Sequence, residues 1–162
     1  MQISVGDTIP SATFVRMGAE GPEQIALKDI TTGKKVIIFG LPGAYTGVCS
    51  TQHVPSYIEN MDTLKEKGVA EVICVTVNDP FVLDAWGKET GATEAGIHML
   101  GDPEGTFTKE IGMSFTAPPA GLINRSLRYA MVLHDNVVTT FNLEGGPGEC
   151  SVSAAPALFD EL

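Results

Sequence analysis

Two short apolar runs with an amphipathic segment between them constrain the fold of this chain more than any other feature. The runs at 36–39 and 71–77 are rich in β-branched residues and bounded by turn formers, so both are predicted to be buried strands. Apolar residues between them recur at every third or fourth position: Val54, Ile58, Met61 and Leu64. This spacing predicts a helix over 49–67 that ends before Gly68. A strand, a helix and a strand in this order form a parallel, right-handed unit.

Further elements follow along the chain. The pattern predicts a helix from Pro80 to about Thr90, a strand at 99–100, a short helix at 104–111, a hairpin of 127–133 and 137–142, and a final helix at 153–162. Asp79 or Asn78 is expected to cap the helix that begins at Pro80, and Ser151 or Ser153 the final helix. This order is typical of an α/β protein with a thioredoxin-like fold, in which helices flank a central mixed β-sheet as a three-layer αβα sandwich.

Composition limits the protein classes that remain. The 162 residues, of which 43% are hydrophobic, suit one domain over 1–162 with a substantial core. A formal net charge of −10 argues against nucleic acid or an anionic membrane as partner. No apolar run approaches the roughly 18 residues of a membrane span, and the first residues do not resemble a signal peptide, so we expect a reducing, cytoplasmic location. Three cysteines, an odd number, favour redox or nucleophilic chemistry over a disulfide framework.

One cysteine follows the loop that comes after the first predicted buried strand. Cys49 lies in the Pro-, Gly- and Thr-containing stretch 41–50, near the start of the predicted helix, where unpaired N–H groups and the helix dipole favour a thiolate. A helix terminus usually contributes about 0.3–1 kcal/mol, whereas lowering a thiol pKa by two units takes ~2.7 kcal/mol. A nearby cation is therefore required. Arg128 is the best candidate, because strand alternation puts it on one small, apolar face with Ala130 and Val132, where a buried guanidinium needs a partner.

The same stretch carries a recognisable motif. The pattern Pro42-x-x-x-Thr46-x-x-Cys49 resembles the active site of the peroxiredoxins, cysteine peroxidases that reduce hydroperoxides. Further segments resemble the type II, or peroxiredoxin-5-like, subfamily: Val5–Pro10, Cys49–Pro55, Val77–Phe81 and Arg125–Tyr129. The resemblance implies that the three motif residues and Arg128 bind the two peroxide oxygens and stabilise the charge that passes from sulfur to the leaving oxygen. On the residues alone, turn chemistry also explains Thr46, and the end of a strand explains Pro42.

The expected function follows from this resemblance. It is that of a thiol-specific peroxidase that reduces hydrogen peroxide and alkyl hydroperoxides through a sulfenic acid on Cys49, in antioxidant defence and redox homeostasis. No metal, haem or flavin is expected as a cofactor. Because the chain contains no Cys-x-x-Cys motif, the reductant must come from outside, as thioredoxin, glutaredoxin or glutathione. The resemblance also implies a homodimer.

Two further cysteines are candidates for the thiol that condenses with oxidised Cys49. Cys150 lies in the polar, Gly-rich stretch 144–151, where acidic neighbours are expected to keep its pKa high, and its position resembles that of the resolving cysteine of animal peroxiredoxin-5. Cys74 lies in a predicted strand, where an inert buried cysteine is ordinary, but its spacing from Cys49 resembles that in plant type II relatives. Cys150 is therefore predicted to resolve Cys49, with Cys74 or an external thiol as alternatives.

Other functions and further site residues stay open at this point. A cysteine hydrolase using Cys49 and His53, four residues apart, is one alternative, and a non-enzymatic redox sensor or chaperone is another. The expectation for His53 is that it hydrogen-bonds the loop and packs beneath the site. Arg125 is kept as a contact around the site. His98 and His134 have no Cys, Asp or His at metal-ligand spacing, so no metal site is expected.

Overall fold

The computed structural model describes residues 2–162, and within them a seven-stranded mixed sheet has the order β2-β1-β5-β4-β3-β8-β9. The central strands β3, β4 and β5 are parallel, whereas β8 and β9 are antiparallel at one side and β1 and β2 form an antiparallel hairpin at the other. Strands β6 and β7 pair separately. The strands are β1 (Thr13–Gly18), β2 (Gly21–Ala26), β3 (Lys35–Gly40), β4 (Glu71–Thr76), β5 (His98–Gly101), β6 (Ser114–Ala117), β7 (Leu122–Ser126), β8 (Tyr129–His134) and β9 (Val137–Leu143).

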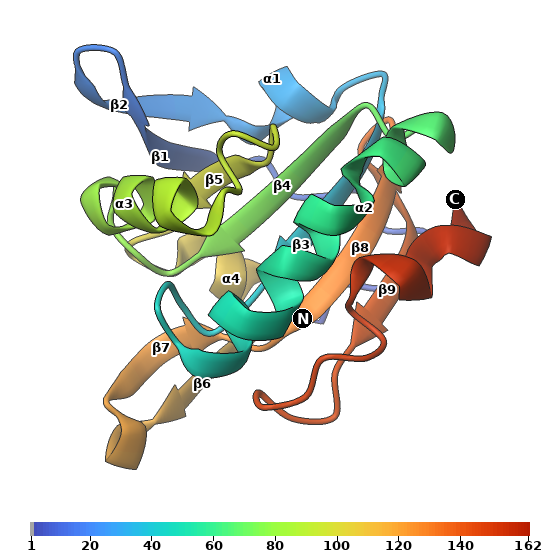
Figure 1. Cartoon of the computed structure of the whole chain (residues 1–162). Coiled ribbons are helices and arrows are strands. Elements are labelled where there is room, and N and C mark those ends of the chain that lie inside the picture. Colours follow the sequence, from blue (N-terminus) through green and yellow to red (C-terminus); the bar gives the residue numbers. More distant parts are fainter. Residues whose placement is uncertain (1) are drawn as a thin grey trace.

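Helices cover both faces of this sheet (Figure 1). Helices α2, α3 and η3 pack on one face, and α1 and α4 on the other, each side with its own apolar core. The three-layer arrangement expected from the order of elements is therefore confirmed. The helices are α1 (Leu27–Thr31), η1 (Cys49–His53), α2 (Val54–Glu66), α3 (Pro80–Thr90), α4 (Thr106–Glu110), η2 (Pro118–Ala120) and η3 (Ala155–Glu161).

The continuous apolar run in β3 is explained by burial on both faces. Ile37 and Phe39 point into the core beneath α2, while Val36 and Ile38 point into the core beneath α1 and α4. The ring of Phe39 stacks on that of Tyr57 in α2, with centroids 4.1 Å apart. Full burial of each such side chain contributes about 1.5–3 kcal/mol, so β3 and the start of α2 are held together firmly. This packing fixes the two elements that flank Cys49.

Helix α3 begins and ends as its sequence predicts. The Asp79 carboxylate accepts a hydrogen bond from the N–H of Val82 at 2.9 Å, and Gly91 ends the helix with φ of 87°. Asn78 does not cap the helix. Its side-chain oxygen instead accepts a hydrogen bond from the N–H of Ala44 at 3.0 Å, in the loop before Cys49. The turn after β4 thus supports the site loop.

Two predictions made from the sequence are wrong, and several elements were not predicted. The strand expected from 127 begins at Tyr129, so Arg128 lies in the link between β7 and β8. The final helix is a 3-10 helix that begins at Ala155, and no side chain caps it, because the hydroxyls of Ser151 and Ser153 both bind Glu144. Helix α1, the β1–β2 hairpin and the β6–β7 hairpin were not expected. Strand β2 is mostly exposed and lacks the alternation on which the prediction of a strand depends.

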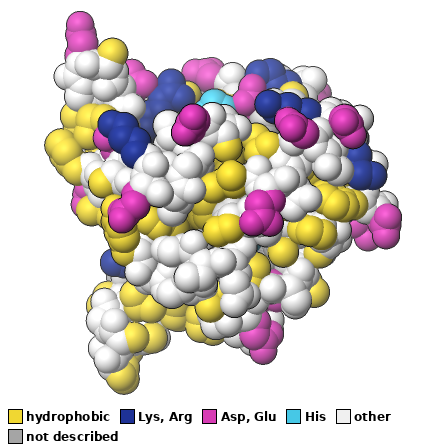
Figure 2. Space-filling model, viewed as in Figure 1, with side chains coloured by type: hydrophobic (Ala, Val, Ile, Leu, Met, Phe, Trp, Pro, Cys, Tyr) yellow, Lys and Arg dark blue, Asp and Glu magenta, His cyan; other side chains and the backbone are white. Residues whose placement is uncertain are grey.

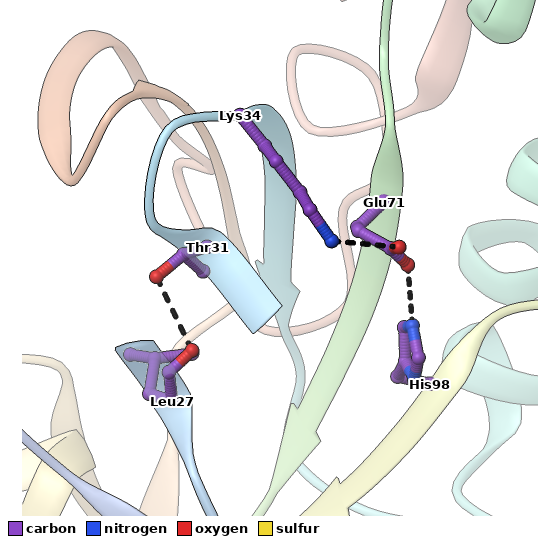
Figure 3. A network of polar contacts seen from close by, with 5 residues as sticks. All are labelled: Leu27, Thr31, Lys34, Glu71 and His98. Carbon is purple, nitrogen blue, oxygen red and sulfur yellow. Dashed lines mark hydrogen bonds and ion pairs between the residues drawn. The ribbon is translucent and has the colours of Figure 1, made fainter. Parts of the chain in front are cut away.

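A polar network joins the amino ends of the parallel strands, whereas Cys49 lies beyond their carboxyl ends. Glu71, at the start of β4, accepts a hydrogen bond from Lys34 before β3, at 3.4 Å, and pairs with His98 at the start of β5 (Figure 3). The side chains of these three residues form no hydrogen bond with the residues predicted for the site. Within residues 2–162, no helix combines the length and apolar character that crossing a membrane requires.

Candidate active site

Cys49 lies at the carboxyl end of β3, where the loop 41–48 joins the strand to a helix. It is the first residue of η1, a π-helical turn that continues as α2, and the N–H of Val54 donates to the carbonyl oxygen of Cys49. The side chain is completely buried, in the core that contains Phe39 and Tyr57. The α/β proteins commonly have their active or ligand-binding sites at helix starts and at the carboxyl ends of parallel strands. The placement of Cys49 at a helix start is as predicted.

Among the described residues, two side chains form hydrogen bonds with the sulfur of Cys49. The Thr46 hydroxyl oxygen lies 2.8 Å from Sγ and 2.7 Å from the carbonyl oxygen of Gly43. The Gly43 carbonyl can only accept, so Thr46 donates to it when the Cys49 thiol donates to Oγ1, and Thr46 can turn its proton toward a thiolate. The second contact is made by Arg128, whose Nη2 donates to Sγ at 3.1 Å.

Arg128 is buried among neutral acceptors. It is 2% exposed, its Nη1 donates to Nδ1 of His53 at 2.9 Å, and its Nε and Nη2 donate to the Pro147 carbonyl at 3.2 and 3.0 Å. In the part of the chain that the structure describes, no carboxylate forms an ion pair with this guanidinium. A buried charge needs a counter-charge, and a thiolate on Cys49 is the group in position to supply it.

His53 positions Arg128 and does not contact Cys49 through a hydrogen bond. Its Nε2 lies 3.1 Å from the Ser153 carbonyl, which can only accept, so Nε2 carries the proton and Nδ1 accepts from Arg128. Burial, together with the Arg128 charge, lowers the pKa of His53 to about 3. His53 is therefore neutral at physiological pH and is no base for Cys49. The geometry contradicts a Cys–His hydrolase pair and agrees with the expected packing beneath the site.

The loop before Cys49 is held from outside by Arg125 of β7. Its Nη1 donates to the carbonyl oxygen of Pro42 at 3.1 Å, and Pro42 is itself buried. A side chain on Gly43 would place its Cβ 2.3 Å from Nη1 of Arg125, so this approach requires glycine. Arg125 thus supports the loop and does not reach the sulfur.

The other two cysteines lie in different surroundings. Cys74 is completely buried in β4, and burial raises its pKa well above the usual range. Cys150 is half-buried in the loop after β9, although its polar, Gly-rich stretch carries no sequence signal of burial. Burial is the largest cause that raises the pKa of Cys150, and the charge of Glu144 adds to it. The charge of Arg128 lowers the pKa of Cys150. The high pKa expected for Cys150 is confirmed, but its main cause is desolvation.

Sequence reasoning missed the residues that hold His53 and Arg128 in place. The Ser153 carbonyl accepts hydrogen bonds from His53 and from the Tyr57 hydroxyl, the latter at 2.7 Å, and Glu144 binds Ser153. A glutamate two residues after the strand predicted over 137–142, followed seven and nine residues later by serines, was the available signal. Within residues 2–162, no group of three or more His, Cys, Asp or Glu is arranged to hold a metal ion.

Comparisons with known proteins agree on one family. The Redoxin family model matches residues 4–158. Peroxiredoxin-2F, mitochondrial, of Oryza sativa subsp. japonica is 48% identical over 136 residues, covering 84% of this chain and 68% of the relative. Peroxiredoxin-2B of Arabidopsis thaliana is 42% identical over 161 residues, 99% of this chain and 98% of the relative. The crystal structure of reduced Prx3 from Vibrio vulnificus in complex with H2O2 matches with a TM-score of 0.91 at 40% identity, covering 99% of both chains.

Proposed function

The chain belongs to the Redoxin family and, within it, to the type II, peroxiredoxin-5-like peroxiredoxins, which are thiol peroxidases of thioredoxin-like fold, and we propose that Cys49 is its peroxide-reducing residue. One observation carries the assignment: a buried guanidinium, Arg128, donates to Cys49 Sγ at 3.1 Å and has only neutral acceptors otherwise. Its charge is therefore free to stabilise a thiolate. Among residues 2–162, no other cation donates a hydrogen bond to a cysteine sulfur.

The proposed reaction uses the sulfur of Cys49 and three side chains around it. The Cys49 thiolate attacks one peroxide oxygen, so that an S–O bond forms as the O–O bond breaks, and the leaving hydroxide or alkoxide takes up a proton as water or alcohol. Arg128 stabilises the negative charge as it passes from sulfur to the leaving oxygen, and the Thr46 hydroxyl binds the peroxide beside the sulfur. Pro42 closes the pocket without a competing N–H. Hydrogen peroxide as a substrate is supported by the Vibrio vulnificus relative, whose reduced form was crystallised in complex with H2O2.

The sulfenic acid on Cys49 is then proposed to condense with Cys150, forming a disulfide and releasing water. Cys150 is half-buried in a loop with three glycines, whereas Cys74 lies inside β4 and could move only with the sheet. A loop moves at a lower cost in free energy than a core strand. Thioredoxin, glutaredoxin or glutathione is proposed as the external reductant, in support of antioxidant defence and redox homeostasis.

A homodimer in a reducing compartment completes the proposal. Large apolar side chains are exposed at the start of α3 and on β7, where Phe81 is 64% and Ile123 53% exposed. Figure 2 shows hydrophobic side chains among scattered charged ones on the side of the molecule that it draws. Such exposed apolar surface suits contact with a second copy of the chain. The cytoplasm stays a prediction, since the relatives from plants include mitochondrial and chloroplastic proteins by name.

Steady-state peroxide consumption with a reducing system tests the assignment. Cys49→Ser is expected to remove turnover to the assay limit, because a hydroxyl is neither ionised near pH 7 nor comparably nucleophilic. Cys74→Ser is the matched control, since it changes an equally buried thiol, and it should keep the rate of sulfenic acid formation. Retention of more than about a tenth of wild-type turnover in Cys49→Ser, on the order of 1.4 kcal/mol of barrier, would contradict the nucleophile. A single turnover in the wild type would instead indicate a redox sensor or chaperone.

A further inference from the structure

The carboxylate of Glu144, directly after β9, binds the end of the loop that closes the site. Glu144 is 7% exposed and accepts from the backbone N–H groups of Ser151 and Ser153, both at 2.8 Å, and from their hydroxyls at 3.2 and 2.6 Å. The N–H of Val152 adds a weaker contact at 3.4 Å. Burial raises the pKa of Glu144, but these hydrogen bonds outweigh it and hold the pKa below its usual range. Glu144 is therefore an anion that several loop donors surround.

These contacts give the closing loop, residues 145–153, a defined shape. Gly145, Gly146 and Gly148 leave its backbone with more conformational freedom than other residues would, and one folded conformation must overcome that entropy. Glu144 precedes the loop and binds its last three residues, so it joins the two ends of the loop. The segment is thereby closed into a ring by a side chain.

Two carbonyl groups of the closing loop hold the groups around Cys49. The Pro147 carbonyl accepts from Nε and Nη2 of Arg128, and the Ser153 carbonyl accepts from Nε2 of His53. His53 in turn accepts from Nη1 of Arg128, and the backbone N–H of Glu144 donates to the Arg128 carbonyl at 3.0 Å. Each of these routes from Glu144 ends at Arg128.

We propose that Glu144 is a positioning residue for Arg128: by folding the closing loop, it sets the orientation in which the guanidinium meets the Cys49 sulfur and the peroxide. The proposal rests on the proposed function, in which Arg128 stabilises the reacting atoms. Within residues 2–162, the guanidinium donates to Cys49, His53 and Pro147 and not to Glu144. Glu144 therefore acts through neutral carbonyls and leaves the charge of Arg128 unpaired.

Glu144→Gln tests the proposal with nearly unchanged side-chain volume. The amide oxygen of glutamine can still accept from Ser151 and Ser153, but the charge is lost and the NH₂ group faces the N–H of Val152, so the ring that closes the loop is weakened. The second-order rate constant for reaction with hydrogen peroxide, measured by stopped flow, should fall about 10- to 100-fold, because small misplacements of reacting groups slow reactions by factors of this size. Glu149→Gln is the matched control, because Glu149 lies exposed in the same loop and loses the same charge. Its rate should stay within about twofold of wild type.

A double-mutant cycle separates positioning from general destabilisation. In an Arg128→Ala background, Glu144→Gln should slow the reaction by less than about twofold further, because the group it positions is absent. A merely structural role would slow the reaction by the same factor in both backgrounds. Equal factors in the two backgrounds, or a wild-type rate for Glu144→Gln alone, would overturn the proposal.

The same data distinguish failure of this proposal from failure of the proposed function. A slow Arg128→Ala with a fast Glu144→Gln refutes only the role of Glu144, whereas a fast Arg128→Ala refutes the role of Arg128 and with it that of Glu144. If Glu144→Gln does not fold, Ser153→Ala takes its place, since it deletes the 2.6 Å hydroxyl contact and keeps the Ser153 carbonyl. Slowing of about threefold or more that disappears in the Arg128→Ala background supports the proposal, and an unchanged rate overturns it.

Discussion

Replacing Arg128 by alanine should slow the reaction with peroxide far more than it slows other chemistry of the same sulfur. The substitution removes the donor at 3.1 Å from Cys49 Sγ together with a buried positive charge. Loss of one preorganised donor of this kind costs about 2.7–4 kcal/mol in the transition state, so kcat/KM for hydrogen peroxide should fall about 10²- to 10³-fold. Alkylation by iodoacetamide develops no charge on a leaving oxygen in the pocket. It should therefore slow by a smaller factor, which reflects only the lost support for the thiolate.

Arg128→Lys distinguishes charge from geometry. Lysine restores the positive charge, but one ammonium group cannot reach Cys49, His53 and Pro147 in the fork that the guanidinium spans, so recovery should be partial. Arg16→Ala is the control, because Arg16 is a surface arginine paired with Glu23. Stopped-flow peroxide kinetics and parallel alkylation rates, with circular dichroism to verify folding, provide the comparison. A folded Arg128→Ala protein within about tenfold of wild type toward peroxide would refute the reasoning.

Three further predictions follow from the geometry. Stoichiometric peroxide should link Cys49 to Cys150, as peptide mapping after alkylation under non-reducing conditions would reveal; a fully alkylatable Cys150 contradicts this. Gly40→Ala should lower the free energy of unfolding by about 1–3 kcal/mol or more, because its Cβ would lie 2.2 Å from the buried ring of Tyr129; an unchanged urea midpoint would refute it. His53, with a pKa of about 3 when folded and ~6.5 when unfolded, contributes stability above pH ~6.5 that is lost as pH falls toward 3, by about 1.4 kcal/mol per pH unit. Urea unfolding from pH 7 to 5 should therefore have a shallower pH dependence in His53→Asn than in wild type, and equal slopes would contradict a buried neutral histidine.

The residues that could be predicted from the sequence are those whose chemistry depends on near neighbours. Thr46 and Cys49 are three positions apart on one loop and helix start, so their contact follows from local geometry. The burial of Arg128 followed from the small apolar residues next to it, although β8 begins one residue later than Arg128. In each case the signal lies within a few positions of the residue.

The parts that could not be predicted depend on contacts between distant segments. The backbone carbonyl of Pro147 accepts hydrogen bonds from Arg128. Every residue has such a carbonyl, so the residue type at position 147 does not indicate this contact. Glu144 follows β9 in a stretch rich in glycine and acid, which predicts an exposed loop, yet it is 7% exposed because the loop turns back onto it. Strand β2 was missed for the opposite reason, since pairing with β1 alone holds an exposed sequence extended.

Because the other acceptors around Arg128 are neutral, its positive charge is left available to the sulfur of Cys49. A carboxylate in direct contact with the guanidinium would lower the free-energy cost of burying Arg128. The carboxylate would also cancel the positive charge that a thiolate and a departing oxygen require. The structure orients the guanidinium with a carbonyl of Pro147 and with His53, which is kept neutral by burial and by Arg128 itself. The buried carboxylate of Glu144 is bound to loop donors instead. Negative charge is thus used to shape the loop, and among the described residues no carboxylate competes with the Cys49 sulfur for the guanidinium of Arg128.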